Sequence, residues 1–132
     1  MASEIPAELR YTPSHEWVRA NADGTVTVGI TDFAQRALGS IVYVEVPDAG
    51  RTVGAGEACV VVESVKSASD VYSPLAGRVT EVNATLVKAA EDVNAEPYGK
   101  GWLFRLLPDD PKAMETLLDH AGYGALVQDA GA

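Results

Sequence analysis

The sequence predicts a mainly β domain, folded as a flattened sandwich or barrel. Short runs of strand-forming residues alternate with turn signals along its 132 residues, and we expect strands near 15–20, 25–30, 41–46, 58–62 and 102–107. A faint internal repeat relates residues 38–44 to residues 75–82. The repeat predicts two similar half-sheets with a hairpin between them.

Two helices are expected beside these strands. Thr31 is a suitable N-cap for a short helix over 32–38, and Gly39 follows its last residue. A C-terminal helix is expected near 111–121, because two aspartates and a proline form a start signal and apolar residues then follow helical spacing. Glycines interrupt that spacing after residue 121, which predicts a frayed extension for the last ten residues.

Length and composition predict one domain over residues 1–132, with an ordered core over about 8–125. Hydrophobic residues make up 47% of the chain and charged residues 22%, which is typical of globular proteins. The formal charge is −9, from 19 acidic and 10 basic residues, and it argues against nucleic acid and anionic membrane as partners. We expect a monomer in the bacterial cytoplasm, since the N-terminus lacks the features of signal and transit peptides.

The sequence holds few groups that could perform catalysis. Cys59 is the only cysteine, and its apolar strand predicts a buried, unreactive thiol. The two histidines, His15 and His120, are far apart in the sequence, and no metal-binding or phosphate-binding motif occurs. We therefore expect no catalytic residue and no metal site, and we interpret the chain as a carrier or a binding module.

Lys66 is the most informative residue of the chain. It lies between two predicted strands, and small residues surround it in the segment 63–70. A lysine in such a turn projects into solvent, where a modifying enzyme can reach its amine. A solvated turn lysine would explain the same position, and the neighbouring motifs decide between the two interpretations.

These motifs resemble the H-protein family of the glycine cleavage system, whose members carry a lipoyl group. The segment 11–18 is similar to the family's opening motif, and 28–45 is similar to its second. The segment 63–77 is similar to its modification site, and shorter matches follow at 81–83, 93–94, 97–99 and 101–103. The resemblance covers roughly residues 8–125, with order and spacing preserved.

The resemblance implies a barrel-sandwich hybrid fold and lipoate attached covalently to Lys66. It also implies a role between enzymes. The family carries an aminomethyl group from glycine decarboxylase (P protein) to the tetrahydrofolate-dependent aminomethyltransferase (T protein). Dihydrolipoamide dehydrogenase (L protein) then reoxidises the arm, and a lipoate-attaching enzyme is a further expected partner.

The resemblance also assigns roles to side chains around the lysine. Ser14, His15, Glu16 and Asp70 match positions that line the cleft in which the loaded arm is shielded from water. Of these, Glu16 is the best candidate to hold the amine through a charge-assisted hydrogen bond. Glu63, three residues before the lysine, matches a recognition mark for the lipoylating enzyme and for the partners.

Four alternative interpretations predict other residues beside the lysine or another role for it. A biotin carrier would have methionines on both sides of the lysine, where this chain has Val65 and Ser67. A lipoyl domain of an oxo-acid dehydrogenase would normally have Asp in the position of Val65 and would belong to a larger catalytic chain. A lipoyl relay that donates lipoate to other enzymes remains open, and so does an unmodified interaction module.

Overall fold

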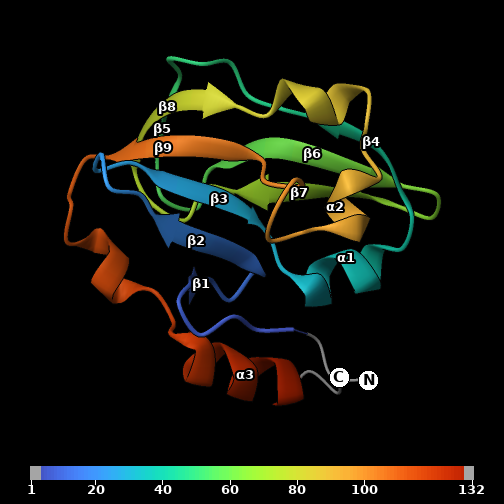
Figure 1. Ribbon diagram of the computed structural model, residues 1–132. Coiled ribbons are helices and arrows are strands. Elements are labelled where there is room, and N and C mark those ends of the chain that lie inside the picture. The colour runs from blue at the N-terminus through green and yellow to red at the C-terminus, as the bar shows by residue number, and fades with distance from the viewer. Residues whose placement is uncertain (1–3, 130–132) are drawn as a thin grey trace.

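The computed structural model describes residues 4–129, and its strands form two antiparallel sheets (Figure 1). The larger sheet has the order β1-β2-β3-β9-β8-β5, and the smaller has the order β4-β6-β7. The strands of the larger sheet are β1 Arg10–Tyr11, β2 Glu16–Ala20, β3 Val26–Ile30, β9 Phe104–Pro108, β8 Gly77–Val82 and β5 Thr52–Val53. Those of the smaller sheet are β4 Ile41–Glu45, β6 Ala58–Ser64 and β7 Ala68–Tyr72. The mainly β prediction is confirmed.

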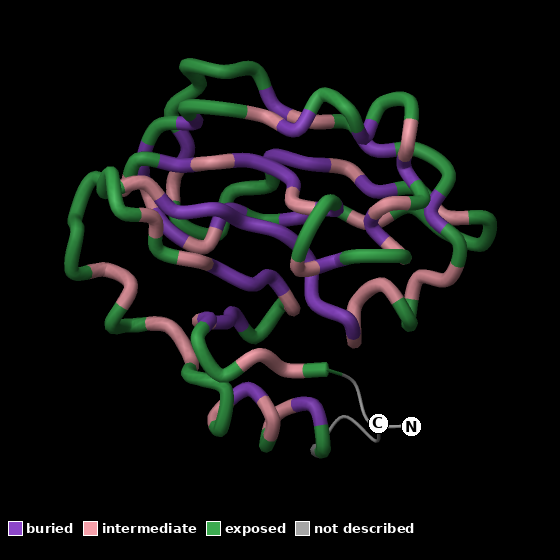
Figure 2. The backbone as a smooth tube through the Cα atoms, viewed as in Figure 1, coloured by how far each residue is buried: buried purple, intermediate pink, exposed green. Residues whose placement is uncertain are grey.

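The main hydrophobic core lies between the two sheets. Val28 and Leu106 reach it from the larger sheet, while Val44, Val62 and Val71 reach it from the smaller one. All five side chains are almost completely buried, and Figure 2 shows the buried stretches concentrated along the inner strands. The alternation of buried and exposed residues along β8 is typical of a strand with one face on the core.

The prediction of two similar half-sheets is wrong, because the sheets contain six and three strands. The two copies of the faint repeat lead into β4 and β8, which lie in different sheets. Both strands carry a register irregularity, between Ile41 and Tyr43 in β4 and between Val79 and Glu81 in β8. The repeat therefore marks two bent strands of similar local sequence, and it does not mark a duplicated sheet.

The short helix predicted over 32–38 is present as α1, Asp32–Leu38. The Thr31 hydroxyl accepts a hydrogen bond from the Ala34 N–H at 3.2 Å, as an N-cap does. Gly39 ends the helix with φ +82°, a conformation that favours glycine. Asn94 fixes this end in space, since its Nδ2 donates to the Gly39 carbonyl at 2.9 Å.

Two short helical segments connect β8 and β9. They are η1, Ala84–Val87, and α2, Asp92–Ala95. Asn94 belongs to α2, and its Oδ1 accepts a hydrogen bond from the Ile41 N–H at 2.8 Å. This connection therefore holds the end of α1 and the beginning of β4 together.

The C-terminal helix prediction is wrong in its boundaries. One short 3₁₀ turn, η2 at Ala113–Thr116, lies in the predicted span of 111–121, and a second helix begins only at its last two residues. The helix itself is α3, His120–Asp129, which occupies the part predicted to fray. No helix of residues 4–129 has the length and apolar character that crossing a membrane requires.

Two local interactions explain this shift of the helix. Leu118 pairs with Tyr11 in an antiparallel bridge, where two backbone hydrogen bonds of 2.8 and 2.9 Å hold the chain extended. Asp119 then begins the next helix, because its Oδ1 accepts a hydrogen bond from the Gly122 N–H at 2.8 Å. Pairing with β1 therefore overrides the helical spacing of the apolar residues.

Helix α3 packs below β1 and β2 and builds a second hydrophobic cluster (Figure 1). The buried members of this cluster are Leu9, Tyr11, Trp17, Tyr123 and Val127. The rings of Tyr11 and Tyr123 are stacked, with their centroids 4.6 Å apart. The C-terminal segment is thus an integral part of the body next to the opening motif.

Candidate functional site

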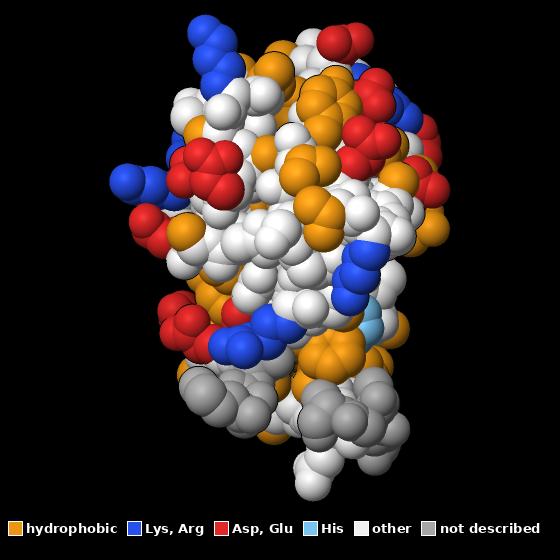
Figure 3. Space-filling model, turned by 90° about the vertical axis from the view of Figure 1, so that its right-hand side faces the viewer, with side chains coloured by type: hydrophobic (Ala, Val, Ile, Leu, Met, Phe, Trp, Pro, Cys, Tyr) orange, Lys and Arg blue, Asp and Glu red, His pale blue; other side chains and the backbone are white. Residues whose placement is uncertain are grey.

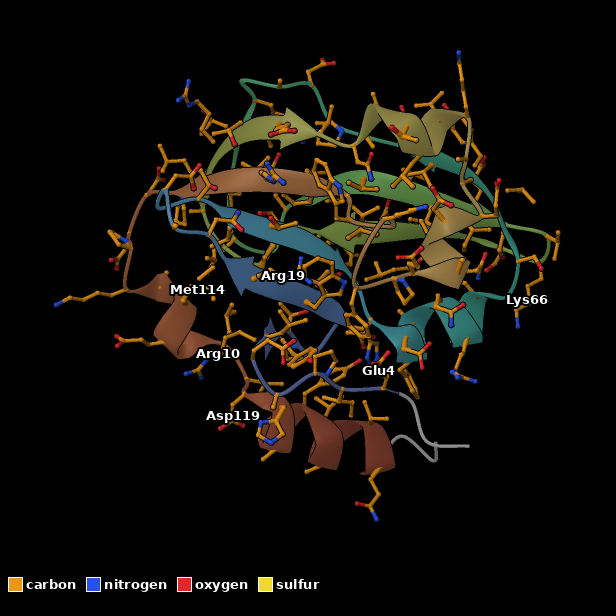
Figure 4. All side chains as sticks on the ribbon, in the orientation of Figure 1. Glu4, Arg10, Arg19, Lys66, Met114 and Asp119 are labelled. Atoms are coloured by element: carbon orange, nitrogen blue, oxygen red, sulfur yellow. The ribbon has the colours of Figure 1, made fainter. Side chains whose placement is uncertain are left out.

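Lys66 lies at the tip of the β6–β7 hairpin and is exposed, as predicted. Figure 4 shows it at the end of the molecule that also carries α1. Ser64 shapes the turn, because its hydroxyl accepts hydrogen bonds from the Lys66 and Ser67 N–H groups at 3.3 and 3.1 Å. The Ser64 N–H also donates to the Ser67 carbonyl at 2.7 Å. The lysine is therefore presented by an ordered turn.

The hairpin tip is anchored to the segment that follows α1. The Val65 N–H donates to the Ser40 carbonyl at 3.1 Å. The Lys66 side chain lies over Gly39, where its Cε is 3.5 Å from the position that a Cβ on this glycine would take. The stem of the lysine therefore runs beside the C-terminal end of α1.

Apolar side chains are exposed around this tip as well as charged ones. The side chains of Val42, Tyr43 and Val65 are 57%, 43% and 73% exposed. Figure 3 views this end of the molecule and shows hydrophobic, acidic and basic side chains close together on its surface. The surroundings of Lys66 therefore offer both apolar and charged contact area.

A cleft of about 160 Å³ lies between the opening motif, α1 and β7. Four of the six predicted site residues line it: Ser14, His15, Glu16 and Asp70. The rest of the wall is formed mostly by apolar side chains, namely Ile30, Ala34, Ala37, Leu38 and Val71, together with Ser69. The fold thus gathers residues that are more than 50 positions apart in the sequence.

Glu16 is a buried carboxyl group at the inner end of the opening motif, with only 2% of its surface exposed. Its Oε1 accepts hydrogen bonds from the hydroxyls of Thr12 at 2.5 Å and Ser14 at 2.6 Å. Its Oε2 accepts one longer bond, from the Tyr72 N–H at 3.3 Å. Burial raises the pKa of Glu16, and these hydrogen bonds offset part of that increase.

His15 has the left-handed backbone conformation, with φ +74°, which is uncommon for a residue other than glycine. Its ring packs against Phe33 of α1, with centroids 4.6 Å apart. Its Nδ1 lies 2.8 Å from the Tyr123 hydroxyl of α3. Burial lowers the pKa of His15, which favours the neutral imidazole.

Glu63 lies outside the cleft. It is exposed on β6, where it pairs with Tyr43 of β4 and Ala68 of β7. The structure therefore separates the six predicted site residues into a group of four in the cleft, and Lys66 and Glu63 on the hairpin.

Three residues outside the predicted site also belong to the cleft's structure. The Thr12 hydroxyl donates to the Glu16 carboxyl group. The hydroxyl oxygens of Thr31 and Tyr123 lie 2.7 Å apart, and that of Tyr123 also contacts His15. Thr12 belongs to the predicted opening motif, and Thr31 is predicted only as a helix N-cap. No pattern in the sequence indicates Tyr123, because it follows Gly122, which interrupts the helical spacing.

A larger hollow of about 320 Å³ lies along β4 and β6, and Asp70 lines it as well. It includes the buried Cys59, whose thiol pKa burial raises to about 11. Arg51 also lines it and is paired with the exposed Glu57 at 2.8 Å. The hollow contains none of the opening-motif residues, and the smaller cleft is therefore the candidate site.

Comparison with known proteins agrees with this arrangement. The family described as Glycine cleavage H-protein matches residues 9–130. This chain belongs to that family. The glycine cleavage system H protein of Halorhodospira halophila is 55% identical over 98% of this chain and 99% of the relative. That of Chromohalobacter salexigens is 57% identical over 95% of each chain.

A solved structure extends the agreement to the fold. A glycine cleavage system H protein from Mycobacterium marinum superimposes with a TM-score of 0.82 and 38% identity. The match covers 97% of this chain and all of that one. The barrel-sandwich hybrid fold that the resemblance implied is thereby confirmed.

Proposed function

We propose that this chain is the lipoyl carrier of a glycine cleavage system and that the lipoyl group is attached to Lys66. In this role it receives an aminomethyl group at the P protein and delivers it at the T protein, and the L protein then reoxidises the arm. The bacterial relatives support the bacterial cytoplasm as the setting. The observation that carries the proposal is an exposed lysine whose stem runs beside the helix that walls the cleft.

The residues fit a lipoyl arm in both reach and chemistry. The stem of Lys66 lies over Gly39 at the end of α1, and Ala34, Ala37 and Leu38 of the same helix line the cleft. Apolar side chains suit the hydrocarbon part of the arm, while Ser14, Glu16 and Asp70 suit a polar cargo. When attached, the lipoyl group would supply a disulfide that opens to bind the cargo through one sulfur, and the dithiol left after transfer would be oxidised back to the disulfide.

Glu16 is the residue that we expect to hold the cargo amine. Both hydroxyl donors bind Oε1, and Oε2 accepts only the 3.3 Å bond from Tyr72, so Oε2 retains capacity for another donor. An ammonium group placed there would form a charge-assisted hydrogen bond and would compensate a buried negative charge. The amine would also be kept out of bulk water.

The chain's own residues therefore attach, orient and shield, and we propose that they perform no bond-breaking step themselves. Glu63 is proposed as part of the surface that the lipoate-attaching enzyme reads, because it is exposed on the strand that leads to the lysine. A tethered arm raises the effective concentration of its tip at a docked partner to the order of millimolar. Transient docking then suffices for transfer.

Glycine–bicarbonate exchange with purified P protein tests this function. The lipoylated wild-type protein should support exchange, Lys66→Arg should not, and Lys112→Arg is the matched control that should retain it. Both lysines are exposed, so neither change should affect folding. A lipoylated wild-type protein that fails to support exchange would contradict the glycine role and favour a lipoate relay.

A further inference from the structure

A continuous chain of hydrogen bonds links α1 to His15 through the C-terminal helix. The Ala34 N–H donates to the Thr31 hydroxyl at 3.2 Å, and Thr31 Oγ1 lies 2.7 Å from the Tyr123 hydroxyl. The Tyr123 hydroxyl lies 2.8 Å from His15 Nδ1. Two walls of the cleft, α1 and the opening motif, are therefore connected through one side chain of α3.

Burial fixes the direction of these hydrogen bonds. Thr31 is completely buried, and its oxygen already accepts from Ala34, so its hydroxyl hydrogen needs an acceptor. Among residues 4–129, the Tyr123 oxygen is the acceptor within reach. With Thr31 donating to it, the Tyr123 hydroxyl donates its own hydrogen to His15 Nδ1. Every other order would leave the hydrogen of one buried hydroxyl, that of Thr31 or that of Tyr123, without an acceptor.

We propose that Tyr123 is a positioning residue of the arm cleft, and that its hydroxyl holds His15 as the Nε2–H tautomer. Nδ1 is then an acceptor whose partner is fixed, and Nε2–H is the remaining polar group of a ring that lines the cleft. The role in the cleft rests on the proposed lipoyl function, whereas the tautomer is a property of the protein without the arm.

The setting of His15 supports a role beyond packing. Its left-handed backbone is held against its steric preference by the contacts with Phe33 and Tyr123. Burial lowers the pKa of His15 and raises that of Tyr123 to about 12, so both groups are neutral near pH 7. A neutral imidazole adds no positive charge beside Glu16 and Asp70, the carboxyl groups that line the same cleft.

Nitrogen-15 NMR of the unlipoylated protein tests the tautomer directly. At a pH at which the imidazole ring is neutral, wild-type His15 should show a protonated Nε2 and an unprotonated Nδ1. His120, the only other histidine, lies exposed at the start of α3 and can be assigned with His120→Gln. A wild-type His15 protonated on Nδ1 would overturn the proposal without any variant of Tyr123.

Two matched substitutions then separate positioning from packing. Tyr123→Phe removes the hydroxyl at His15, while Tyr11→Phe removes one from the stacked neighbour, whose hydroxyl donates to the Pro6 carbonyl at 2.6 Å. Tyr123→Phe should shift the His15 tautomer ratio by about threefold to tenfold, as loss of an ordinary hydrogen bond does, and should raise its pKa. Tyr11→Phe should change neither. Equal effects of both variants would overturn the proposal.

The loaded protein provides the functional measurement. P protein first loads the arm with the aminomethyl group derived from glycine. Ammonia release from the loaded arm should then be severalfold faster in Tyr123→Phe than in Tyr11→Phe. Release at the Tyr11→Phe rate would contradict a positioning role in the cleft. If the protein cannot be loaded at all, the proposed function fails, while the NMR result still decides the tautomer.

Discussion

The lysine hairpin and the cleft beside it are built in different ways. Ser64 orders the hairpin through bonds to residues two and three positions away, and its tip is exposed. The cleft depends on bonds between distant segments, such as Glu16 with Tyr72 and His15 with Tyr123. Changes at the tip should therefore affect lipoylation and largely spare the fold. Changes in the cleft should affect both the shielding of the cargo and the stability of the fold.

Lys66→Arg makes the largest functional change that the hairpin allows. We expect complete loss of lipoylation and of glycine-dependent activity, because arginine has no primary amine to acylate. The free energy of unfolding should stay within about 0.5 kcal/mol of wild type, since the side chain is exposed. Urea unfolding measures the stability, and a large loss there would contradict the independence of the tip.

Gly29→Ala is the corresponding change in the strands that carry the cleft, because Gly29 precedes Ile30, which lines the cleft, and pairs with Trp17 of β2. A Cβ at Gly29 would lie 2.6 Å from three atoms of the Trp17 ring. That ring is completely buried, and its Nε1 donates to the Pro97 carbonyl at 2.8 Å, so it cannot move without losing contacts. We expect a loss of about 1–3 kcal/mol in urea unfolding, as overpacking causes. Gly24→Ala is a turn control: nothing lies within 4 Å of its Cβ position, so its cost reflects backbone conformation alone.

Glu16→Gln should separate stability from function within the cleft. Burial raises the pKa of Glu16 above its usual value of 4.5, so the folded protein binds this proton more tightly than the unfolded chain does. The resulting stability is present below pH 4.5 and is lost as the pH rises through the folded-state pKa.

Glutamine does not titrate, so the variant should gain stability relative to wild type as the pH rises from 4.5 through the folded-state pKa of Glu16. Urea unfolding of both proteins across this range gives the difference directly. In the loaded variant, ammonia release from the arm should be faster, because the carboxylate is absent. A variant that becomes less stable relative to wild type with rising pH would contradict the assigned pKa direction.

Ser64→Ala should have the smallest effect on function. It removes the hydroxyl that accepts two backbone N–H groups in an exposed turn, where water can replace it. We expect a cost of about 0.5–1.5 kcal/mol and slower lipoylation, because the tip becomes less ordered. Ser67→Ala, a serine of the same turn that bonds to Ser64 through its backbone, is the matched control. Equal lipoylation rates for both variants would show that turn order does not matter.

The parts that the sequence predicted are those decided by local interactions. The hairpin around Lys66, the N-cap at Thr31 and the C-cap at Gly39 all depend on neighbouring residues. The opening motif could be assigned to the cleft only through resemblance to a family. Its contacts with β7 and α1 depend on how distant strands pair, which periodicity does not reveal.

The C-terminal segment shows why the rest could not be predicted. Helical spacing of apolar residues indicated a helix over 111–121, but Leu118 pairs with Tyr11, which is more than 100 positions away. Glycines at 122 and 124 argued against a helix where one forms, and the cap at Asp119 together with packing of Tyr123 outweighs their low propensity. The hydrogen bond between Tyr123 and His15 could not be predicted either, because the sequence indicates no helix at Tyr123.

Peptide mapping of the protein from its native host tests the central claim most directly. The chain has four lysines, Lys66, Lys88, Lys100 and Lys112. We predict that tandem mass spectrometry finds a lipoyl group on Lys66 and on none of the other three. A lipoyl group on another lysine, a biotinyl group on Lys66, or an unmodified Lys66 in cells that lipoylate other proteins would contradict the account.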